Sequence, residues 1–539
     1  MLSGLRRRVV DATRDLAART AWTHKACLPT LGQWQSPSYS ASAGLMCPWP
    51  SSVRFDGALN ARCLSGRPTG VYSASVETQR AVLETTDEGL YRALSRWNAL
   101  AIVVGGVIGT GIYLRPTSVA QLVQTPVAIV AVWLGAGLLT MAGALTYSDL
   151  AARLPRSGGE YAFLHATLGN IPAFLFGWMR LTVGVSIVGA LAVAFTVFLS
   201  DFVALGDIAR RVIPVLLIAV LATLNVLGVA KAGRFQSYVT SVKVAGIVAL
   251  VVALLVLAPS RTTPLESSEN LFPTTVGPSA FGAALLAALS AYHGWPLATM
   301  VGGEVKDAQR NLPWALVVGI GVVIAIYLLA NVAYLQALPM SDILRSNSTA
   351  FPNAASIASR AAVATLGTRV SKLLTVAFMI SALGALHCHL LAVPRVFFAM
   401  ARDRNMPKVL ALVLPGRRTP YVAIIALAAL GTLFAVFGSY DRLSNMSSFG
   451  YLLFYALNAF GLLYAGKRLP ARTGHTGLPI WIPLAFLLGT TSILVTVVAS
   501  GLREIIVALT LLAVGFPVYI ALRWWFWSSP TQETTASRS

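Results

Sequence analysis

The sequence predicts an all-α, polytopic membrane protein with twelve transmembrane helices, and three observations support this fold class. Of its 539 residues, 56% are hydrophobic and only 11% are charged, against roughly 25% charged in a typical globular domain. Twelve apolar runs follow one another from residue 97 onward, each long enough to cross a hydrocarbon core of about 30 Å. Two of these runs carry glycine or proline at their centres, where a helix disfavours both. This composition excludes a soluble enzyme, a DNA-binding module and a disordered protein.

The apolar runs are separated by polar segments or by proline and glycine, and these separators set the expected boundaries. Within a membrane domain spanning 91–530, helices are expected at 97–122, 127–151, 171–200, 211–230, 237–258, 279–302, 313–338, 371–400, 420–438, 444–465, 478–500 and 504–526. Residues 531–539 are expected to form a short C-terminal tail.

Residues 1–90 differ from the rest of the chain. They are rich in Ser, Pro, Gly and Arg and lack the run of roughly 20 apolar residues that a bilayer crossing needs. We expect a disordered cytosolic tail, or a reading frame extended upstream of a start nearer Met46. The four cysteines have neither zinc-site nor disulfide-framework spacing, so we interpret them as unpaired thiols and expect no metal site and no cofactor.

The formal net charge of +21 comes from 41 Lys and Arg against 20 Asp and Glu. We attribute it to loops and expect no nucleic acid partner, because membrane proteins concentrate Lys and Arg in cytoplasmic loops. With the N-terminus inside, the inner loops hold more Lys and Arg than the outer ones, and an even number of spans places the C-terminus inside too. We therefore expect a multi-pass protein of the plasma membrane, surrounded by the lipid bilayer, with both termini cytoplasmic.

The first apolar run is interrupted at residues 105–113, where four glycines occupy seven consecutive positions. Each glycine disfavours the helix by up to about 1 kcal/mol relative to alanine. In a membrane, unwound backbone persists only where it is buried in protein or lines a cavity. The glycines therefore predict a broken helix beside a cavity, or, as an alternative, a close helix-packing seam.

Unwinding at this place would create a site with two opposite polar ends. The amide N–H groups of Gly109, Thr110 and Gly111 would begin the second half-helix, whose positive end suits a carboxylate. The first half would end in the free carbonyls of Val107 and Ile108, which suit an ammonium group. The pair of ends fits the zwitterionic head of an α-amino acid.

The sixth run, residues 279–302, is interrupted near its centre by Gly294 and Pro296. Interrupted helices at corresponding places in two halves indicate an inverted-repeat transporter, with its substrate site between the breaks near the bilayer midplane. The repeats would be 97–258 and 279–465, followed by helices 11 and 12 at 478–526.

Five motifs in order and spacing carry a family resemblance over residues 95–410. They are Gly109-Thr-Gly-Ile-Tyr-Leu-Arg-Pro116, Gly143-Ala-Leu-Thr-Tyr-Ser-Asp-Leu150 with Leu154-Pro-Arg-Ser-Gly-Gly-Glu-Tyr161, His293-Gly-Trp295, Gly303-Glu-Val-Lys-Asp-Ala-Gln-Arg-Asn-Leu-Pro313, and Ser381-Ala-Leu-Gly384 with Pro394-Arg-Val-Phe-Phe-Ala-Met-Ala-Arg-Asp403. The sequence resembles the amino acid–polyamine–organocation superfamily and, within it, the L-type amino acid transporter family. The resemblance implies a LeuT-type fold of two inverted five-helix repeats, with helices 1 and 6 broken.

The resemblance also implies which groups bind the substrate. Its carboxylate would meet the helix 1 amides named above, and its ammonium would meet the carbonyls of Val107 and of helix 6 at Ser290, Ala291 and His293. The aromatic gate of many relatives is Ser290 here, so Tyr292 or His293 is expected to replace it, beside Trp295.

A lysine in the fifth run, Lys243, is a functional candidate because a charge at mid-bilayer costs about 2.5–3.5 kcal/mol. Sodium-independent relatives place a helix 5 lysine where sodium-coupled transporters hold an ion. Its ammonium would bridge to helix 1 carbonyls and Ser381, with proton carriage as a further role. A fixed structural tether and a side chain reaching the cytoplasm are the alternatives. The resemblance thus argues against sodium coupling.

On helix 8 the usual asparagine of the family is His387, which is expected to face the side-chain pocket, with His389 packed away. A core histidine without a substrate role is the alternative. Glu160, Glu304 and Arg395 are expected at the cytoplasmic face as an inner gate of salt bridges, while Arg180 in helix 3 is expected to bond backbone carbonyls.

The expected function is secondary transport of L-amino acids by alternating access, independent of sodium, as an exchanger or a proton-coupled carrier. The alternatives are a non-transporting amino acid sensor and a polyamine transporter, which would want acidic residues that helices 1, 3, 6 and 8 lack at mid-depth. An enzyme is not expected. Animal relatives join a glycoprotein heavy chain through a cysteine between helices 3 and 4. Residues 200–211 contain none, so no disulfide-linked heavy chain is expected.

Overall fold

The structure is a computed structural model, and it describes residues 53–56, 60–63, 89–200, 202–258, 277–348, 350–351, 354–437, 440–471, 477–499 and 503–528. The chain divides into two units, Met1–Ser75 and Val76–Ser539. The described residues of the first unit form strands β1 (Val53–Asp56) and β2 (Asn60–Cys63), paired antiparallel with Val53 opposite Cys63. The sequence did not predict this pair. The rest of the expected tail up to residue 88, including Met46, lies outside the described residues.

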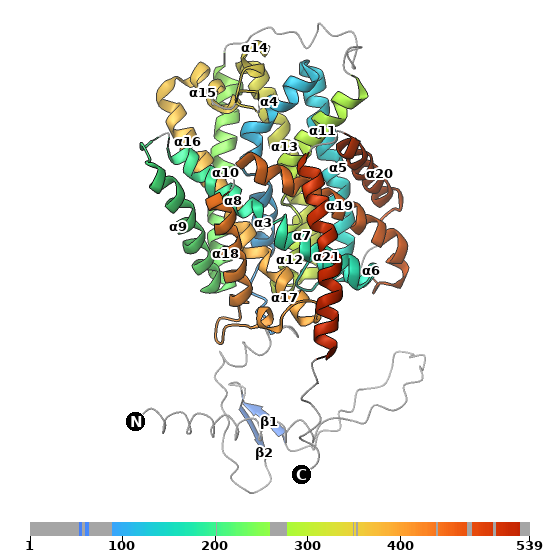
Figure 1. Cartoon of the computed structure of the whole chain (residues 1–539). Helices are drawn as coiled ribbons and strands as arrows, with labels where there is room; N and C mark the ends of the chain where they lie inside the picture. The colour runs from blue at the N-terminus through green and yellow to red at the C-terminus, as the bar shows by residue number, and fades with distance from the viewer. Residues whose placement is uncertain are drawn as a thin grey trace. The chain divides into compact units, whose positions relative to one another are not determined.

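The described residues of the second unit are almost entirely helical, as the coiled ribbons of Figure 1 show. Its long helices are α3 (Arg96–Val107), α4 (Gly111–Val123), α5 (Pro126–Arg153), α7 (Asn170–Thr182), α8 (Ser186–Leu199), α9 (Asp207–Val226), α10 (Val229–Leu257), α11 (Pro278–Tyr292), α13 (Ala308–Ala337), α16 (Thr368–Ala392), α18 (Tyr421–Phe437), α19 (Tyr440–Ala465), α20 (Trp481–Ala499) and α21 (Arg503–Ser528). Each of the twelve expected ranges overlaps at least one described helix. The clearest boundary error is α10, which begins at Val229 rather than near 237.

Several of these helices are long and apolar enough to cross a membrane. Within the described residues five qualify, namely Pro126–Arg153, Asn170–Leu199, Val229–Leu257, Ala308–Ala337 and Lys372–Arg402. A sixth span is made by α3 and α4 together, which are bent by 42° at the break between them. These lengths and compositions identify a multi-pass membrane protein.

Short helices lie between the long ones. Two of them, α12 (Leu297–Met300) and α17 (Pro394–Arg402), fall in the expected ranges 279–302 and 371–400 and follow breaks after α11 and α16. The sequence did not predict the others, which are α6 (Glu160–Thr167), α14 (Met340–Leu344), α15 (Ile357–Leu366) and the 3₁₀ turns η2 (Gly302–Glu304), η3 (Lys408–Ala411) and η4 (Gly466–Arg468). Helix α15 illustrates their origin, because Ser356 caps its first turn by accepting a hydrogen bond from the Ser359 amide. Such segments are too short to produce a hydropathy signal of their own.

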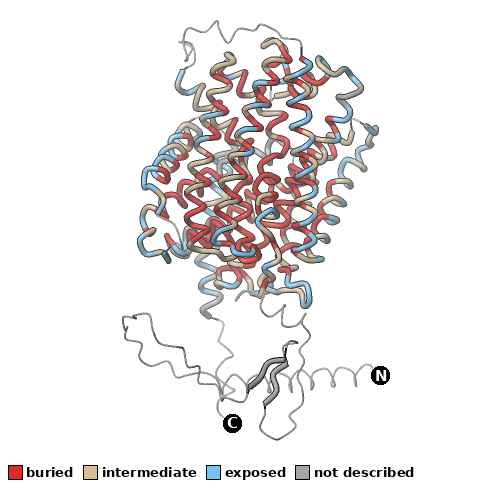
Figure 2. The backbone as a smooth tube through the Cα atoms, turned by 180° about the vertical axis from the view of Figure 1, so that it is seen from behind, coloured by how far each residue is buried: buried red, intermediate tan, exposed pale blue. Residues whose placement is uncertain are grey.

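The centre of the helical unit is filled by side chains from helices far apart in sequence, and α5 packs along α13 there. Figure 2 shows buried residues concentrated inside the bundle and exposed ones on its outside. Large apolar side chains such as Leu138 (59% exposed) and Phe437 (81%) belong to that outer surface. An outer surface this apolar fits a lipid environment.

Candidate functional site

The first break separates α3 from α4. Helix α3 ends at Val107, and Ile108 leaves the helical region with φ −70° and ψ 84°. The Gly109 amide folds back on the Val107 carbonyl at 2.7 Å, and α4 begins at Gly111. The glycine-rich run therefore unwinds over three residues and leaves carbonyls of the last turn of α3 without helical partners.

The second break follows α11, which ends at Tyr292. His293 is extended, and Gly294 has φ +105°, a conformation that residues with a Cβ rarely adopt. The two breaks touch, since a Cβ atom at Gly294 would lie 2.3 Å from the carbonyl oxygen of Gly106. A Cβ atom at Gly111 would likewise lie 2.8 Å from the Cα of Ala291. These glycines therefore serve both unwinding and close backbone packing.

A cavity of about 70 Å³ lies between the two breaks. Most residues that the sequence assigned to the substrate line it, namely Val107, Gly109, Thr110, Gly111, Ser290, Ala291 and His293. Arg115, Ile187, Leu191 and Tyr451 contribute to the remaining wall, and the lining includes no Asp or Glu. Ile108 and His387 do not line the cavity.

Ile108 lies on the other side of the break, against a buried cation. The ammonium of Lys243, 1% exposed, donates to the carbonyl oxygens of Gly105 at 2.6 Å and Ile108 at 2.7 Å. The Ser381 hydroxyl donates to the carbonyls of Ile108 and Gly109, each at 3.1 Å. Helices α10 and α16 thus hold the carbonyls freed by the first break.

The two histidines of α16 lie opposite to the expectation, because His389 rather than His387 faces the cavity. His389 lines the cavity, whereas the Nδ1 of His387 donates to the Gln236 side-chain oxygen at 2.7 Å. The His387 ring also packs edge-on against Phe235. Residues i and i+2 lie on different helix faces, so only one of the pair can meet the cavity. The sequence could not fix the rotation of α16, and the expectation for His387 is corrected.

A tyrosine that the sequence did not single out joins the two breaks. The Tyr327 hydroxyl, on α13, lies 3.1 Å from the carbonyl oxygens of both Val107 and Ala291. Its ring packs edge-on against Trp133 and beside Tyr292. The expected gate residue Tyr292 is itself buried and donates to the Trp133 carbonyl at 3.3 Å. A tyrosine inside an otherwise apolar run was the only sequence signal available for this position.

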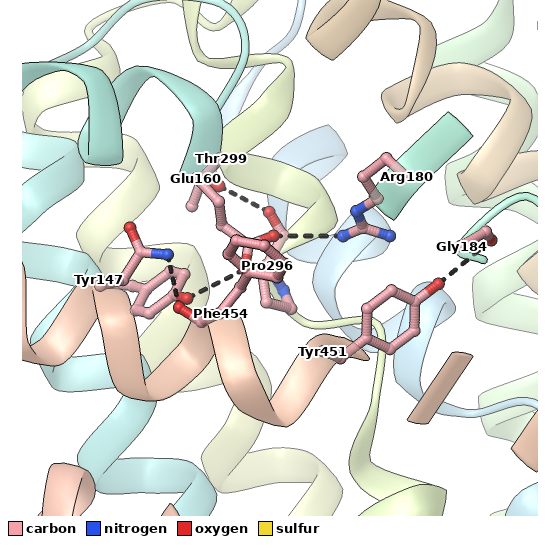
Figure 3. A network of polar contacts seen from close by, with 9 residues as sticks. Tyr147, Glu160, Arg180, Gly184, Pro296, Thr299, Tyr451 and Phe454 are labelled. Carbon is pink, nitrogen blue, oxygen red and sulfur yellow. Dashed lines mark hydrogen bonds and ion pairs between the residues drawn. The ribbon is translucent and has the colours of Figure 1, made fainter. Parts of the chain in front are cut away.

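The expected inner gate consists of two separate ion pairs, and both are buried rather than at the surface. Arg395 donates through Nε and Nη2 to both carboxylate oxygens of Glu304, at 2.7 and 3.0 Å, and neither side chain is exposed. Glu160 instead accepts from Arg180 at 3.2 Å and from the Tyr147 hydroxyl at 3.0 Å, as Figure 3 shows. Arg180, which was expected to bond backbone carbonyls, is therefore the ion-pair partner of Glu160.

The pair of Glu160 and Arg180 is connected to the cavity wall. The Arg180 guanidinium lies 4.5 Å from the centre of the Tyr451 ring, and Tyr451 donates to the Gly184 carbonyl at 3.3 Å (Figure 3). Tyr451 in turn packs against the His293 ring. Trp295, the other expected gate residue, packs against Tyr147 and Tyr455. An aromatic layer thus separates the cavity from the Glu160 pair.

Comparison with known proteins identifies the family. The family model described as amino acid permease matches residues 94–522, most of the chain. The chain belongs to the amino acid permease family. The resemblance to the amino acid–polyamine–organocation superfamily and its L-type branch is confirmed, and the permease is an amino acid transporter rather than an enzyme.

Three relatives of the permease illustrate its range of similarity. The serine/threonine exchanger SteT of Bacillus subtilis is 29% identical over 449 residues, covering 82% of this chain and 99% of that protein. The b(0,+)-type amino acid transporter 1 of Homo sapiens is 28% identical, covering 70% of this chain and 77% of its own. The cystine/glutamate transporter of Homo sapiens is 25% identical, covering 74% and 78%.

The cavity of the permease combines the polar groups that an amino acid head requires. Residues at the start of α4 and at the ends of α3 and α11, where the helical backbone hydrogen bonding is interrupted, border the same space. No carboxylate or thiolate among its lining residues would hold a metal, and no cluster of three His, Cys, Asp or Glu residues occurs in the described part of the chain. The arrangement supports reversible binding of a zwitterion through backbone groups.

Proposed function

We propose that the permease is a sodium-independent exchanger that moves small neutral L-amino acids across the membrane by alternating access. The observation that carries this proposal is the Lys243 ammonium on the Gly105 and Ile108 carbonyls. The Lys243 ammonium is a fixed cation that binds carbonyl oxygens of the first broken helix. A sodium ion would need oxygen ligands of the same kind. The carrier then needs no dissolved cation to complete its site.

The substrate would lie between the two breaks. Its carboxylate would accept from the amides of Gly109, Thr110 and Gly111, and its ammonium would meet the carbonyls of Val107 and Ala291. Ser290 and His293 would border the side chain, and Ser381 would support the break from behind. A lining without Asp or Glu argues against a polyamine, whose several ammonium groups need acidic partners.

The small cavity and its histidine favour a short hydroxyl side chain. His389 donates through Nδ1 to the Ala385 carbonyl at 2.9 Å, so its Nε2 remains a hydrogen-bond acceptor suited to a hydroxyl. The name of the bacterial relative SteT, a serine/threonine exchanger matched along 99% of its length, points the same way. Serine and threonine are therefore the substrates we propose to test first.

The finer architecture belongs to the same proposal. We infer twelve spans, with 97–258 and 279–465 as inverted LeuT-type repeats, helices 11 and 12 at 478–526, and flanking tails at 1–90 and 531–539. Both termini would be cytoplasmic in the plasma membrane, with Glu160, Glu304 and Arg395 in the inner gate and Tyr292 and Trp295 in the aromatic gate of the sixth helix. The segment joining α8 to α9 has no cysteine, which supports a carrier without a disulfide-linked heavy chain.

Exchange in proteoliposomes tests this function. Liposomes containing the full chain and preloaded with L-serine should take up radiolabelled L-serine, equally in sodium and choline buffers, and empty liposomes should not. Uptake that follows an imposed sodium gradient would contradict the proposal. Uptake into empty liposomes that follows an imposed proton gradient would replace exchange with proton symport. Saturable serine binding without flux would favour a sensor, and uptake of putrescine would favour a polyamine carrier.

A further inference from the structure

A second and larger cavity, of about 440 Å³, lies away from the substrate site and shares no lining residue with it. It is bordered by the segment before α3, the end of α5 and the loop to α6, the turn η2, and the end of α17. Its volume falls within the range of small-molecule binding sites. Nothing in the transport mechanism described above uses it.

Four arginines from separate segments line this cavity, with one carboxylate among them. They are Arg92, Arg153, Arg156 and Arg402, and the carboxylate is Asp403. Arg153 is already paired with Asp149 at 2.8 Å and donates to the Gly466 and Pro470 carbonyls. Arginines therefore outnumber carboxylates among the described residues that line this cavity.

Asp403 is held in place from the side of α6. The Asn405 amide donates to the Tyr161 hydroxyl at 2.9 Å, and Tyr161 lies within hydrogen-bonding reach of Asp403. Burial, together with the Asp403 charge, raises the pKa of Tyr161 well above its ordinary value, so the hydroxyl keeps its proton. Tyr161 therefore remains a hydrogen-bond donor that holds the Asp403 carboxylate in place beside the arginines.

One arginine of the cavity carries a buried nitrogen without a hydrogen bond. The Nε of Arg156 is shielded from solvent and has no partner among the described residues. A buried donor without an acceptor is destabilising, and more so when the group is charged. An acceptor-rich anion bound in the cavity would remove this cost.

We propose that this cavity binds a phosphate-bearing anion, either a phosphomonoester headgroup of a membrane lipid or a soluble phosphate compound. A phosphomonoester carries about −1.5 to −2 charge at pH 7, and an arginine-rich lining attracts such an anion. Its oxygens suit guanidinium groups, which bind phosphate through paired, parallel N–H donors. The anion would be held chiefly by Arg156 and Arg402 and supported by Arg92.

The position of the cavity gives the bound anion a consequence for transport. Gly303 and Ala399 line it, and they lie next to Glu304 and one turn beyond Arg395, the buried ion pair. An anion bridging the segment before α3, the α5–α6 loop and α17 would hold these elements together and slow the opening of this end. This effect on rate rests on the proposed function, whereas the binding itself does not.

Binding to the purified full chain in phosphatidylcholine nanodiscs tests the site. The two probes are radiolabelled ATP, for a soluble phosphate, and phosphatidic acid added to the nanodisc, for a lipid headgroup. We expect saturable binding of one probe, weakened at least about tenfold by Arg156→Gln or Arg402→Gln and less by Arg156→Lys, which keeps the charge but loses the fork. Arg310→Gln is the matched control, because Arg310 is exposed near the same end and does not line the cavity.

Three results would overturn the site. They are the absence of saturable binding of both probes, unchanged binding in Arg402→Gln, and equal weakening in Arg310→Gln, which would indicate general charge attraction. Arg402 is exposed, so its variant should fold even if an Arg156 variant does not. Serine exchange measured with and without the bound probe tests the effect on rate. Exchange that is absent from all proteoliposomes would reject the transport function while leaving the binding result intact.

Discussion

The ammonium of Lys243 lies 2.7 Å from the carbonyl oxygen of Ile108, and the same oxygen accepts from the Ser381 hydroxyl at 3.1 Å. Both acceptor positions of one carbonyl at the first break are therefore occupied by donors from two other helices. The break is a three-helix junction rather than a local irregularity of one helix. Its geometry depends on side chains more than 130 residues away in sequence.

Lys243→Met should abolish the function that we assign to this junction. The substitution keeps the length of the side chain but removes the ammonium from the Gly105 carbonyl and leaves the Ile108 carbonyl with Ser381 as its side-chain donor, inside the protein. We expect serine uptake in proteoliposomes to fall at least about tenfold, with no rescue by sodium. Lys231→Met, at an exposed position of the same helix, is the control and should transport normally. Normal uptake by Lys243→Met would remove the proposed role.

Gly111→Ala should block transport by steric conflict. A Cβ atom at Gly111 would lie 2.8 Å from both the Cα and the Cβ of Ala291, so the two breaks would have to separate. Overpacking of this kind costs about 1–3 kcal/mol. Uptake should be lost while the protein still reaches the membrane. Gly246→Ala is the control, since a Cβ atom there would meet its nearest neighbour at 3.9 Å, and it should remain active.

Tyr327→Phe should destabilise the paired breaks. It removes the hydroxyl shared by the Val107 and Ala291 carbonyls and keeps the aromatic packing, at a cost of about 1–3 kcal/mol. We expect a lower Tm in detergent and slower exchange. Tyr334→Phe, on the same helix, provides a matched control, because the Tyr334 hydroxyl is buried without a hydrogen-bond partner among the described residues. The prediction fails if the two variants lose stability equally.

Replacing one residue of the Glu304–Arg395 pair should lower the stability of the protein more than replacing both. Both side chains are fully buried, and a single replacement leaves one charge uncompensated, at about 3–5 kcal/mol. Glu304→Leu and Arg395→Leu should each lower the Tm strongly, while the double variant should recover much of the loss. Thermal unfolding of all four proteins forms a double-mutant cycle. Additive effects of the two substitutions would show that the side chains do not interact.

His389→Ala and His387→Ala should have different effects. His389 lines the cavity, so its removal should change the KM for serine several-fold while largely preserving the Tm. His387→Ala should leave the Gln236 oxygen without its donor and lower stability by about 1–3 kcal/mol, with an unchanged KM. Uptake kinetics and thermal unfolding of both variants distinguish these results. The reverse pattern would restore His387 as the substrate-facing residue.

The long helices and the two breaks were predictable because hydropathy and glycine content are local properties of the sequence. The place of Gly109, Thr110 and Gly111 beside the cavity could be predicted from the position of the first break alone. What could not be predicted depends on helix rotation and packing. Three contacts depend on which side of one helix meets another. They are the His387 contact with Gln236, the Arg180 pair with Glu160 and the Tyr327 contact with Val107. A short segment such as α6 has too few residues for a periodic signal.

The burial of Lys243 also has an electrical consequence. Moving one elementary charge across a membrane potential of 100 mV changes the free energy by about 2.3 kcal/mol. The Lys243 ammonium is covalently part of α10, so its charge stays with the protein while a zwitterionic amino acid, which is neutral overall, crosses. On the proposed mechanism the membrane voltage therefore neither drives nor opposes exchange. The direction of net movement is left to the amino acid concentrations on the two sides.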